Sequence, residues 1–150
     1  MLFKMFQEQP AYISKPLTFH QRRSIAKTRL GCLPVRLETG RYSIPRLPEE
    51  ERVCLVCKPP NLPQLVVVDP PSDPEPAQVL PVETEAHFLF SCVAYNVERE
   101  LWFSKMCLPI DFETLPLESK LKTVLNDPSN VKATSTFITN SFNARSKILK

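Results

Sequence analysis

Three cysteines and one histidine form two close pairs, a Cys-x2-Cys motif at Cys54 and Cys57 and a His-x4-Cys motif at His87 and Cys92. Thiolates and imidazole are the ligands that zinc prefers in a closed tetrahedral site. The pattern therefore predicts a structural zinc ion that joins two remote segments of the chain. Because 29 residues separate Cys57 from His87, more than in the usual zinc finger, one alternative stays open. The four side chains would then be ordinary buried residues.

The spacing of the second pair makes a geometric prediction. His87 and Cys92 are five positions apart, so on an unbroken α-helix at about 100° per residue their side chains would point about 140° apart. Both can reach one ion only if the helix that carries His87 ends or loosens before Cys92. An ion held by all four side chains has no open coordination position, which predicts a structural rather than a catalytic role.

The chain holds 16 prolines but only two glycines among its 150 residues. Glycine supplies the left-handed turns of β-hairpins, while proline interrupts β-ladders and helix interiors. This balance predicts a mainly α fold, in which residues 1–16 are a loose N-terminal segment and residues 17–150 form one small helical domain. Eight prolines and no basic residue fall within residues 59–81. We expect this stretch to be an extended loop inside the domain, since the two metal-binding motifs flank it.

Helix signals begin after the N-terminal segment. Thr18 and Gln21 make the Thr-x-x-Gln pattern of a capping box, and apolar residues then recur at helical spacing. Gly31 is suited to the left-handed position that follows many helices. The sequence therefore predicts a helix over about residues 19–30.

Apolar spacing predicts more helices in the C-terminal half. The pattern over about residues 94–106 places Val97, Leu101 and Trp102 on one apolar side, which we expect to be buried. Three others are predicted: a short helix through His87 to Ser91 capped by Thr84, one from Pro116 until Asp127-Pro128 stops it, and one opening at Asn130 with Lys132, Arg145 and Lys147 on its outer side.

Charge is divided unevenly along the chain. Residues 1–46 hold nine lysines and arginines against two acidic residues, whereas residues 47–100 hold three against ten. A basic segment is typical of a face that meets phosphate, although a solvated helix surface has the same composition. We expect contact with DNA or RNA through this basic N-terminal third, with Tyr42 stacking on bases. The candidate contacts are Arg22, Arg23, Lys27, Arg29, Arg36 and Arg41.

Other classes of function lack their sequence signals. The chain has no Gly-x-Ser-x-Gly elbow, no phosphate-binding glycine-rich loop, no His-Glu-x-x-His motif and only two histidines, so we do not expect an enzyme. Five cysteines without a signal-peptide pattern indicate a reducing, intracellular compartment, the nucleus or the cytoplasm. The apolar runs are far shorter than the ~20 residues of a membrane-spanning helix, so no membrane contact is expected.

Three strings resemble a known family: RLETGRYSIPRLPEEERVCLVC at residues 36–57, VETEAHFLFSCVAY at residues 82–95 and FITNSFNARSKI at residues 137–148. They are similar to the cysteine- and histidine-bearing C-terminal tail that follows the reverse transcriptase domain in animal non-LTR retrotransposons. The resemblance covers residues 22–57 and 83–103 well, and the C-terminal part more weakly.

The resemblance implies a zinc-binding region that helps to hold nucleic acid during target-primed reverse transcription, with Cys54, Cys57, His87 and Cys92 as the metal ligands. The chain departs from the family in two respects. It has no Asp-Asp pair, and two-metal nucleotidyl transfer needs carboxylates that hold both ions. Its proline-rich stretch also looks longer than the family's connection at that point.

Two functional hypotheses follow. The first is a retrotransposon-derived, zinc-stabilised nucleic-acid-binding accessory module that lacks the polymerase. The second is a non-catalytic structural or protein-interaction domain, such as a decayed fragment of an element, in which zinc only holds the fold. Salt-dependent binding to DNA or RNA distinguishes them, because phosphate contacts release counterions.

Overall fold

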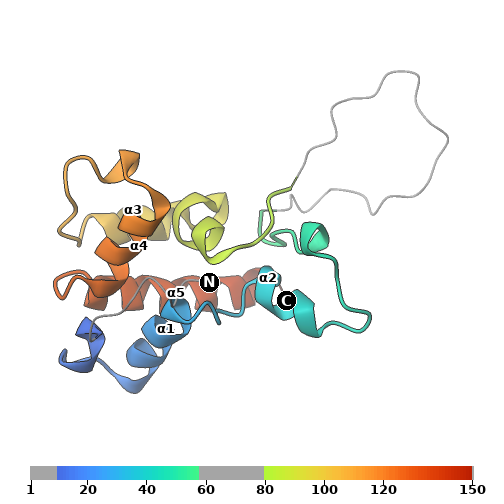
Figure 1. Cartoon of the computed structure of the whole chain (residues 1–150), viewed down its shortest axis with the longest axis horizontal. Coiled ribbons are helices and arrows are strands. Elements are labelled where there is room, and N and C mark those ends of the chain that lie inside the picture. The colour runs from blue at the N-terminus through green and yellow to red at the C-terminus, as the bar shows by residue number, and fades with distance from the viewer. Residues whose placement is uncertain (1–9, 58–79, 150) are drawn as a thin grey trace.

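Helix α5 (Val131–Ile148) is the longest helix of the described residues, and the other main helices pack against it. The computed structural model describes residues 10–57 and 80–149, and within them α5 runs through the centre of the molecule (Figure 1). Helix α1 (Phe19–Arg29) lies along one side of it, and α3 (Asn96–Phe103) and α4 (Leu117–Asn126) lie along the other. All three helices contact α5. The predicted mainly α class is confirmed.

Short helical turns connect these helices. The turns that precede Cys54 and Cys57 are gathered at one end of the molecule, with α2 drawn near the C-terminal end of α5 (Figure 1). Their bounds are η2 (Ala11–Ile13), α2 (Arg36–Thr39), η3 (Gly40–Tyr42), η4 (Glu49–Glu51), η5 (His87–Ser91), η6 (Val93–Tyr95) and η7 (Phe112–Thr114).

Helix α1 begins and ends as its sequence predicts. Thr18 Oγ1 accepts a hydrogen bond from the Gln21 backbone N–H at 3.3 Å, and Gln21 Oε1 accepts one from the Thr18 N–H at 3.0 Å. This reciprocal pair satisfies two N–H groups that the first turn leaves free. Gly31 follows with a φ of 66°, a conformation that strains any residue with a Cβ. Ile25, fully buried, is the main apolar contribution of α1 to the core.

The N-terminal segment is more ordered than its sequence suggested. In the described part, residues 10–16, the chain forms η2 and packs near α1, α4 and α5. The Arg22 guanidinium donates to the carbonyl oxygens of Tyr12, Ile13, Lys15 and Leu17 at 2.9 to 3.3 Å. One cation thus satisfies four carbonyls of a segment that has no regular ladder. Residues 1–9 lie outside the described part.

Aromatic side chains fill the core between α3, α5 and η5. The Trp102 ring stacks on Phe137 at 4.3 Å between centroids, and Phe88 stacks on Phe142 at 4.8 Å. The Trp102 indole N–H donates to Thr134 Oγ1 at 3.2 Å, so its one polar atom has a partner in the core. Tyr95 packs edge-on against Phe88. The prediction that Trp102 is a core residue is confirmed.

Two predictions about helix faces are wrong. Val97 and Leu101, expected to be buried with Trp102, are 68% and 56% exposed, because the inner face of α3 is formed by Trp102 and Arg99. Arg145, expected on the outer side of α5, is only 8% exposed. It forms a two-pronged salt bridge with the fully buried Glu83. Periodicity alone did not reveal that buried carboxylate and carbonyl groups attract these two arginines.

The predicted proline-rich loop, residues 59–81, falls almost wholly outside the described residues. Where the chain is described again, Val82 pairs with Val53 in an isolated antiparallel bridge, and the described residues contain no longer strand. The bridge pairs the residue before Cys54 with the segment that leads to His87, so the beginnings of the two candidate metal-binding motifs lie near each other. No helix in the described ranges is long and apolar enough to cross a membrane.

Candidate metal centre

The four predicted ligands converge on one point. Their ligand atoms all lie within 4.8 Å of one another. The Cys57 sulfur lies 3.2 Å from that of Cys92 and 3.3 Å from His87 Nε2, and the sulfurs of Cys54 and Cys92 are 3.8 Å apart. A tetrahedral ion with metal–sulfur bonds of about 2.3 Å has sulfur–sulfur edges of about 3.8 Å. The cluster could therefore hold a metal ion, and its dimensions and donors are compatible with zinc.

The first cysteine pair is held in place by the Val53–Val82 bridge and the hydrogen bonds beside it. The Cys54 N–H donates to the Pro81 carbonyl at 2.9 Å, and the Glu83 N–H donates to the Arg52 carbonyl at the same distance. These bonds fix Cys54 against the second motif, while the turn that follows it brings Cys57 round to the same side. Cys54 is fully buried and Cys57 is half-buried.

The second pair is carried by η5, which is a π-helical turn. The Cys92 N–H donates to the His87 carbonyl five residues earlier, at 2.7 Å, and Cys92 itself has an extended backbone with φ −64° and ψ 118°. The wider turn brings residues five apart nearer to one face than an α-helix would, and such turns are frequent at functional sites. Thr84 Oγ1 accepts from the His87 N–H at 3.0 Å. The prediction that the helix loosens before Cys92 is confirmed.

Glu83 lies next to the cluster and connects it with the rest of the fold. The Cys54 thiol donates to Glu83 Oε1 at 3.6 Å, while Oε2 accepts from the Arg36 backbone N–H at 2.6 Å. Arg145 on α5 donates to both carboxylate oxygens. Burial raises the pKa of Glu83, although the hydrogen bonds from Arg145 lower it. Both oxygens are engaged, so this carboxylate is a neighbour of the cluster and not a fifth ligand.

A second buried arginine lies on the other side of the cluster. Arg99, 8% exposed, donates from Nη2 to the Cys92 carbonyl at 2.8 Å and from Nε to the Leu89 carbonyl at 2.9 Å. The Leu89 carbonyl lies in the last turn of η5, which ends at Ser91, so the guanidinium supplies a donor that the helix no longer provides. The Cys92 carbonyl also accepts from the Tyr95 backbone N–H at 3.2 Å. The positive charge of Arg99 also lies beside the thiols of Cys57 and Cys92, where it favours the ionised forms.

The three cysteine side chains shift one another's pKa values in opposite directions. A hydrogen bond from Cys92 lowers the pKa of Cys54 to about 3. Hydrogen bonding to Cys54, together with burial, raises the pKa of Cys92, and burial raises the pKa of Cys57. A dication that displaces the thiol protons would bind all three sulfurs as thiolates and leave the centre with a net charge of −1.

The structure does not leave all six predicted phosphate contacts at the surface. Arg29 is 5% exposed and donates to Asn126 Oδ1 at 3.0 Å. The Arg22 guanidinium donates to the carbonyls of the N-terminal segment. Arg36 has a buried Nε without a hydrogen-bond partner. Arg23 and Arg41 are exposed, Arg41 with a weak ion pair to Glu38, and Lys27 is half-exposed. Solvent-facing charge is thus smaller than composition suggested.

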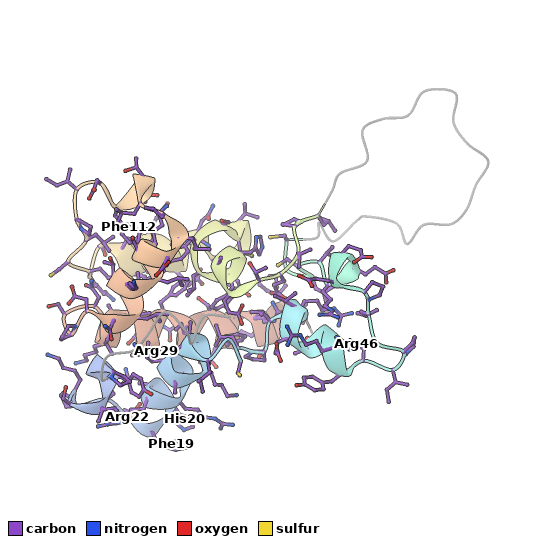
Figure 2. All side chains as sticks on the ribbon, viewed as in Figure 1. Phe19, His20, Arg22, Arg29, Arg46 and Phe112 are labelled. Carbon is purple, nitrogen blue, oxygen red and sulfur yellow. The ribbon has the colours of Figure 1, made fainter. Side chains whose placement is uncertain are left out.

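Sequence reasoning missed part of the exposed basic surface. The loop between Gly40 and Leu47 is closed by a hydrogen bond between these two residues, and Arg52 donates twice to the Leu47 carbonyl. Its tip presents Tyr42, 78% exposed, and Arg46, which Figure 2 shows near the end of the molecule opposite His20 and Phe19. Arg41 and Tyr42 were predicted from the sequence as contacts but Arg46 was not, although all three lie within six consecutive residues.

Comparisons of the chain with protein-family models, with curated proteins and with solved structures find no match. The resemblance to retrotransposon tails therefore remains a prediction, and the metal centre is supported by its geometry alone.

Proposed function

We propose that this protein is a zinc-stabilised, non-catalytic nucleic-acid-binding module, of the kind found as the C-terminal accessory tail of retrotransposon reverse transcriptases and lacking the polymerase. The observation that carries the proposal is the convergence of three sulfurs and one imidazole nitrogen from motifs 29 residues apart. Four protein ligands complete a tetrahedron, so the ion would hold the fold rather than activate a water molecule.

Zinc is the metal that the donor set favours. Three thiolates with one imidazole are soft to borderline ligands, which suits zinc better than magnesium, calcium or manganese. The nearest carboxylate, Glu83, is occupied by Arg145 and the Arg36 N–H. A site that offers only sulfur and nitrogen therefore has little affinity for the hard cations that prefer oxygen.

The loop from Gly40 to Leu47 supports the nucleic-acid part of the proposal. Arg52, 4% exposed, fastens its base through the Leu47 and Leu37 carbonyls, so the loop backbone is ordered before a ligand binds and the ordering cost at binding is lower. Tyr42 offers a ring on which an unpaired base can stack, and Arg41 and Arg46 flank it with charges for the adjoining phosphates. This arrangement favours single strands over duplexes, whose bases are already stacked.

The zinc proposal is tested by native mass spectrometry of the full chain purified without added metal. We expect one zinc ion per chain and its loss in Cys57→Ser. Cys32→Ser is the matched control, because Cys32 is an exposed free cysteine outside the cluster. A chain that carries no metal, and takes none up when zinc is supplied, would refute the proposal.

The nucleic-acid proposal is tested by fluorescence anisotropy with single-stranded DNA and RNA at several salt concentrations. About four phosphate contacts give a slope of log K against log salt near −3 for single strands. The double variant Arg41→Glu/Arg46→Glu should lower affinity at least tenfold. Lys122→Glu/Lys147→Glu, with both lysines exposed and outside this loop, is the charge-matched control. Absence of binding at low salt would refute this part and leave the zinc site untouched.

A protein-interaction role is the second candidate, and one observation favours it. Val97 and Leu101 are large apolar residues that remain 68% and 56% exposed on α3. Adjacent exposed apolar side chains often mark an interface. If no nucleic acid binds, and Leu101→Asp abolishes a defined complex while preserving the circular dichroism spectrum, this second role replaces the first.

A further inference from the structure

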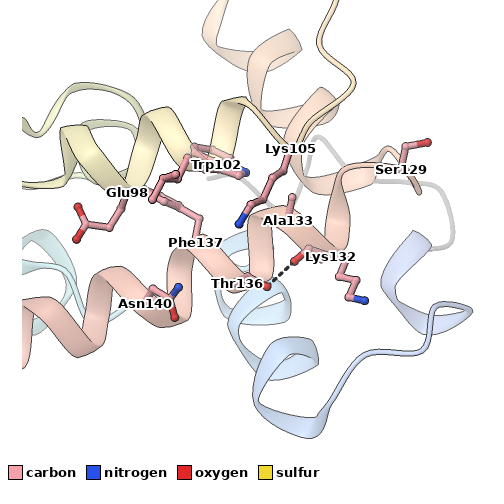
Figure 3. A pocket seen from close by; sticks show the side chains of 10 residues that line it. Glu98, Trp102, Lys105, Ser129, Lys132, Ala133, Thr136, Phe137 and Asn140 are labelled. Atoms are coloured by element: carbon pink, nitrogen blue, oxygen red, sulfur yellow. Dashed lines mark hydrogen bonds between the residues drawn. The ribbon is translucent and has the colours of Figure 1, made fainter.

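A groove between α3 and α5 has the size of a ligand site. Its volume is about 410 Å³, within the range of about 300 to 1,000 Å³ that small-molecule sites occupy. The two helices run antiparallel along it, since Glu98 lies opposite Asn140 at one end and Lys105 opposite Ser129 and Lys132 at the other (Figure 3). The metal centre contributes no residue to this lining.

The two ends of the groove carry opposite chemistry. Lys105 and Lys132 are exposed and, among the residues the structure describes, neither forms a salt bridge. The N-terminal end of α5 lies at this end too, so the helix dipole adds to the positive charge of the lysines. At the opposite end lie Glu98, whose carboxylate can accept hydrogen bonds, and Asn140, whose amide can both donate and accept them. The groove is therefore polarised along its length.

The middle of the groove is apolar and firmly positioned. Trp102 and Phe137 form its floor and stack on each other at 4.3 Å. The hydrogen bond from the Trp102 indole to Thr134 fixes the indole in place. Leu101 also lines the groove and is 56% exposed, so it could pack against a flat apolar group that lies there. An apolar floor with a few polar groups at its ends is the usual character of a ligand site.

We propose that this groove binds one nucleotide, with its phosphate between Lys105 and Lys132 and the donor edge of its base at Glu98. From Lys132 to Asn140, eight residues of helix span about 12 Å, close to the length of a 5′-nucleotide. Guanine is the preferred base, because its adjacent ring N–H and amino group can both donate to one carboxylate. This inference rests on the proposed nucleic-acid-binding function, for which it names a nucleotide-specific contact.

The ligand has two possible sources, a free nucleotide or an unpaired residue of a strand, and they share the same chemistry. A base inside a duplex is excluded, because its donor edge is paired and its faces are stacked. A strand bound by both the Gly40–Leu47 loop and the groove would gain affinity from the second contact. The experiment therefore includes 5′-GMP and short single-stranded oligonucleotides with and without guanine.

The fluorescence of Trp102 reports directly on the groove, since it is the only tryptophan of the chain. We expect 5′-GMP to change this fluorescence saturably, and guanosine and inorganic phosphate to bind at least tenfold more weakly. Lys105→Glu/Lys132→Glu should weaken 5′-GMP by about a hundredfold, about tenfold for each lysine. Glu98→Gln should remove the preference for 5′-GMP over 5′-UMP. Lys147→Glu, exposed near the C-terminal end of α5 and outside the groove lining, is the control.

Several outcomes overturn the inference. One is an unchanged Trp102 signal at millimolar 5′-GMP; another is a response that survives reversal of both lysines. Saturable binding of an acidic peptide in place of nucleotides would assign the groove to a protein partner. If oligonucleotides bind through Arg41 and Arg46 while 5′-GMP does not bind, the groove proposal fails and the proposed function stands.

Discussion

If the four side chains hold a zinc ion as we propose, its removal should release one arm of the molecule and leave the helical core folded. We define the metal arm as residues 34–57, whose helices α2, η3 and η4 have only four, three and three residues. The arm contributes few buried apolar side chains, chiefly Val35 and Cys54. By contrast, α5 has 18 residues and packs against α1, α3 and α4 independently of the metal ligands. Helices this short are not stable without tertiary contacts.

The size of the effect follows from linkage. A ligand that binds only the folded state at a free concentration 1,000 times its Kd stabilises that state by about 4 kcal/mol. For a domain of this length each kcal/mol shifts Tm by about 2 to 4 °C, so chelation should lower Tm by about 8 to 16 °C.

The assay compares thermal unfolding and hydrogen exchange with and without a zinc chelator. Far-UV circular dichroism should keep most of its helical signal, while amide exchange accelerates in the metal arm and stays slow in α5. Cys57→Ser should behave as the chelated protein, and Cys32→Ser as the untreated one. An unchanged Tm after exhaustive chelation would refute a metal role in folding. Loss of all helical signal would refute the separation between arm and core.

Three other perturbations test individual contacts. Glu83→Gln leaves the buried Arg145 without its counter-charge and should cost about 3 to 5 kcal/mol in urea unfolding, whereas the exposed Glu51→Gln should be near neutral; equal costs would contradict the ion pair. Asn130→Ala, which removes three hydrogen bonds of a fully buried side chain, should cost about 1 to 3 kcal/mol; a cost near zero would show that they do not stabilise the fold. Burial raises the pKa of Tyr95 from 10.0 to about 12, so the unfolded state loses its proton first and stability should fall between these pH values. Tyr95→Phe should remove that part of the alkaline loss, and an identical pH profile would contradict the assignment.

The parts of the fold that the sequence predicted depend on local chemistry. The capping box of Thr18 and Gln21, the left-handed Gly31 and each of the two candidate metal-ligand pairs are short patterns, made of residues that are close together in the sequence. The loosened turn before Cys92 was predictable for the same reason, because two side chains five positions apart on an α-helix cannot both face one ion. Such local requirements do not depend on the tertiary contacts made by the rest of the chain.

The failures concern side chains whose surroundings come from distant segments. Arg145 and Glu83 are 62 residues apart, and nothing in the spacing of α5 indicates that one of its charged positions meets a buried carboxylate. The burial of Arg99 was likewise not predicted, because the Leu89 and Cys92 carbonyls that accept from it face it only in the folded turn at the end of η5. Helical periodicity ranks the apolarity of a face but cannot foresee a buried cation.

These two arginines also explain how a sulfur-rich centre can be buried here. A zinc ion with three thiolates and a neutral imidazole carries a net charge of −1, which low-dielectric surroundings disfavour. Arg145 neutralises Glu83, so the carboxylate 3.6 Å from the Cys54 sulfur adds no net repulsion. Arg99 then supplies one positive charge beside Cys92, which balances the centre. The two residues that periodicity could not place are therefore those that make the predicted metal site electrostatically complete.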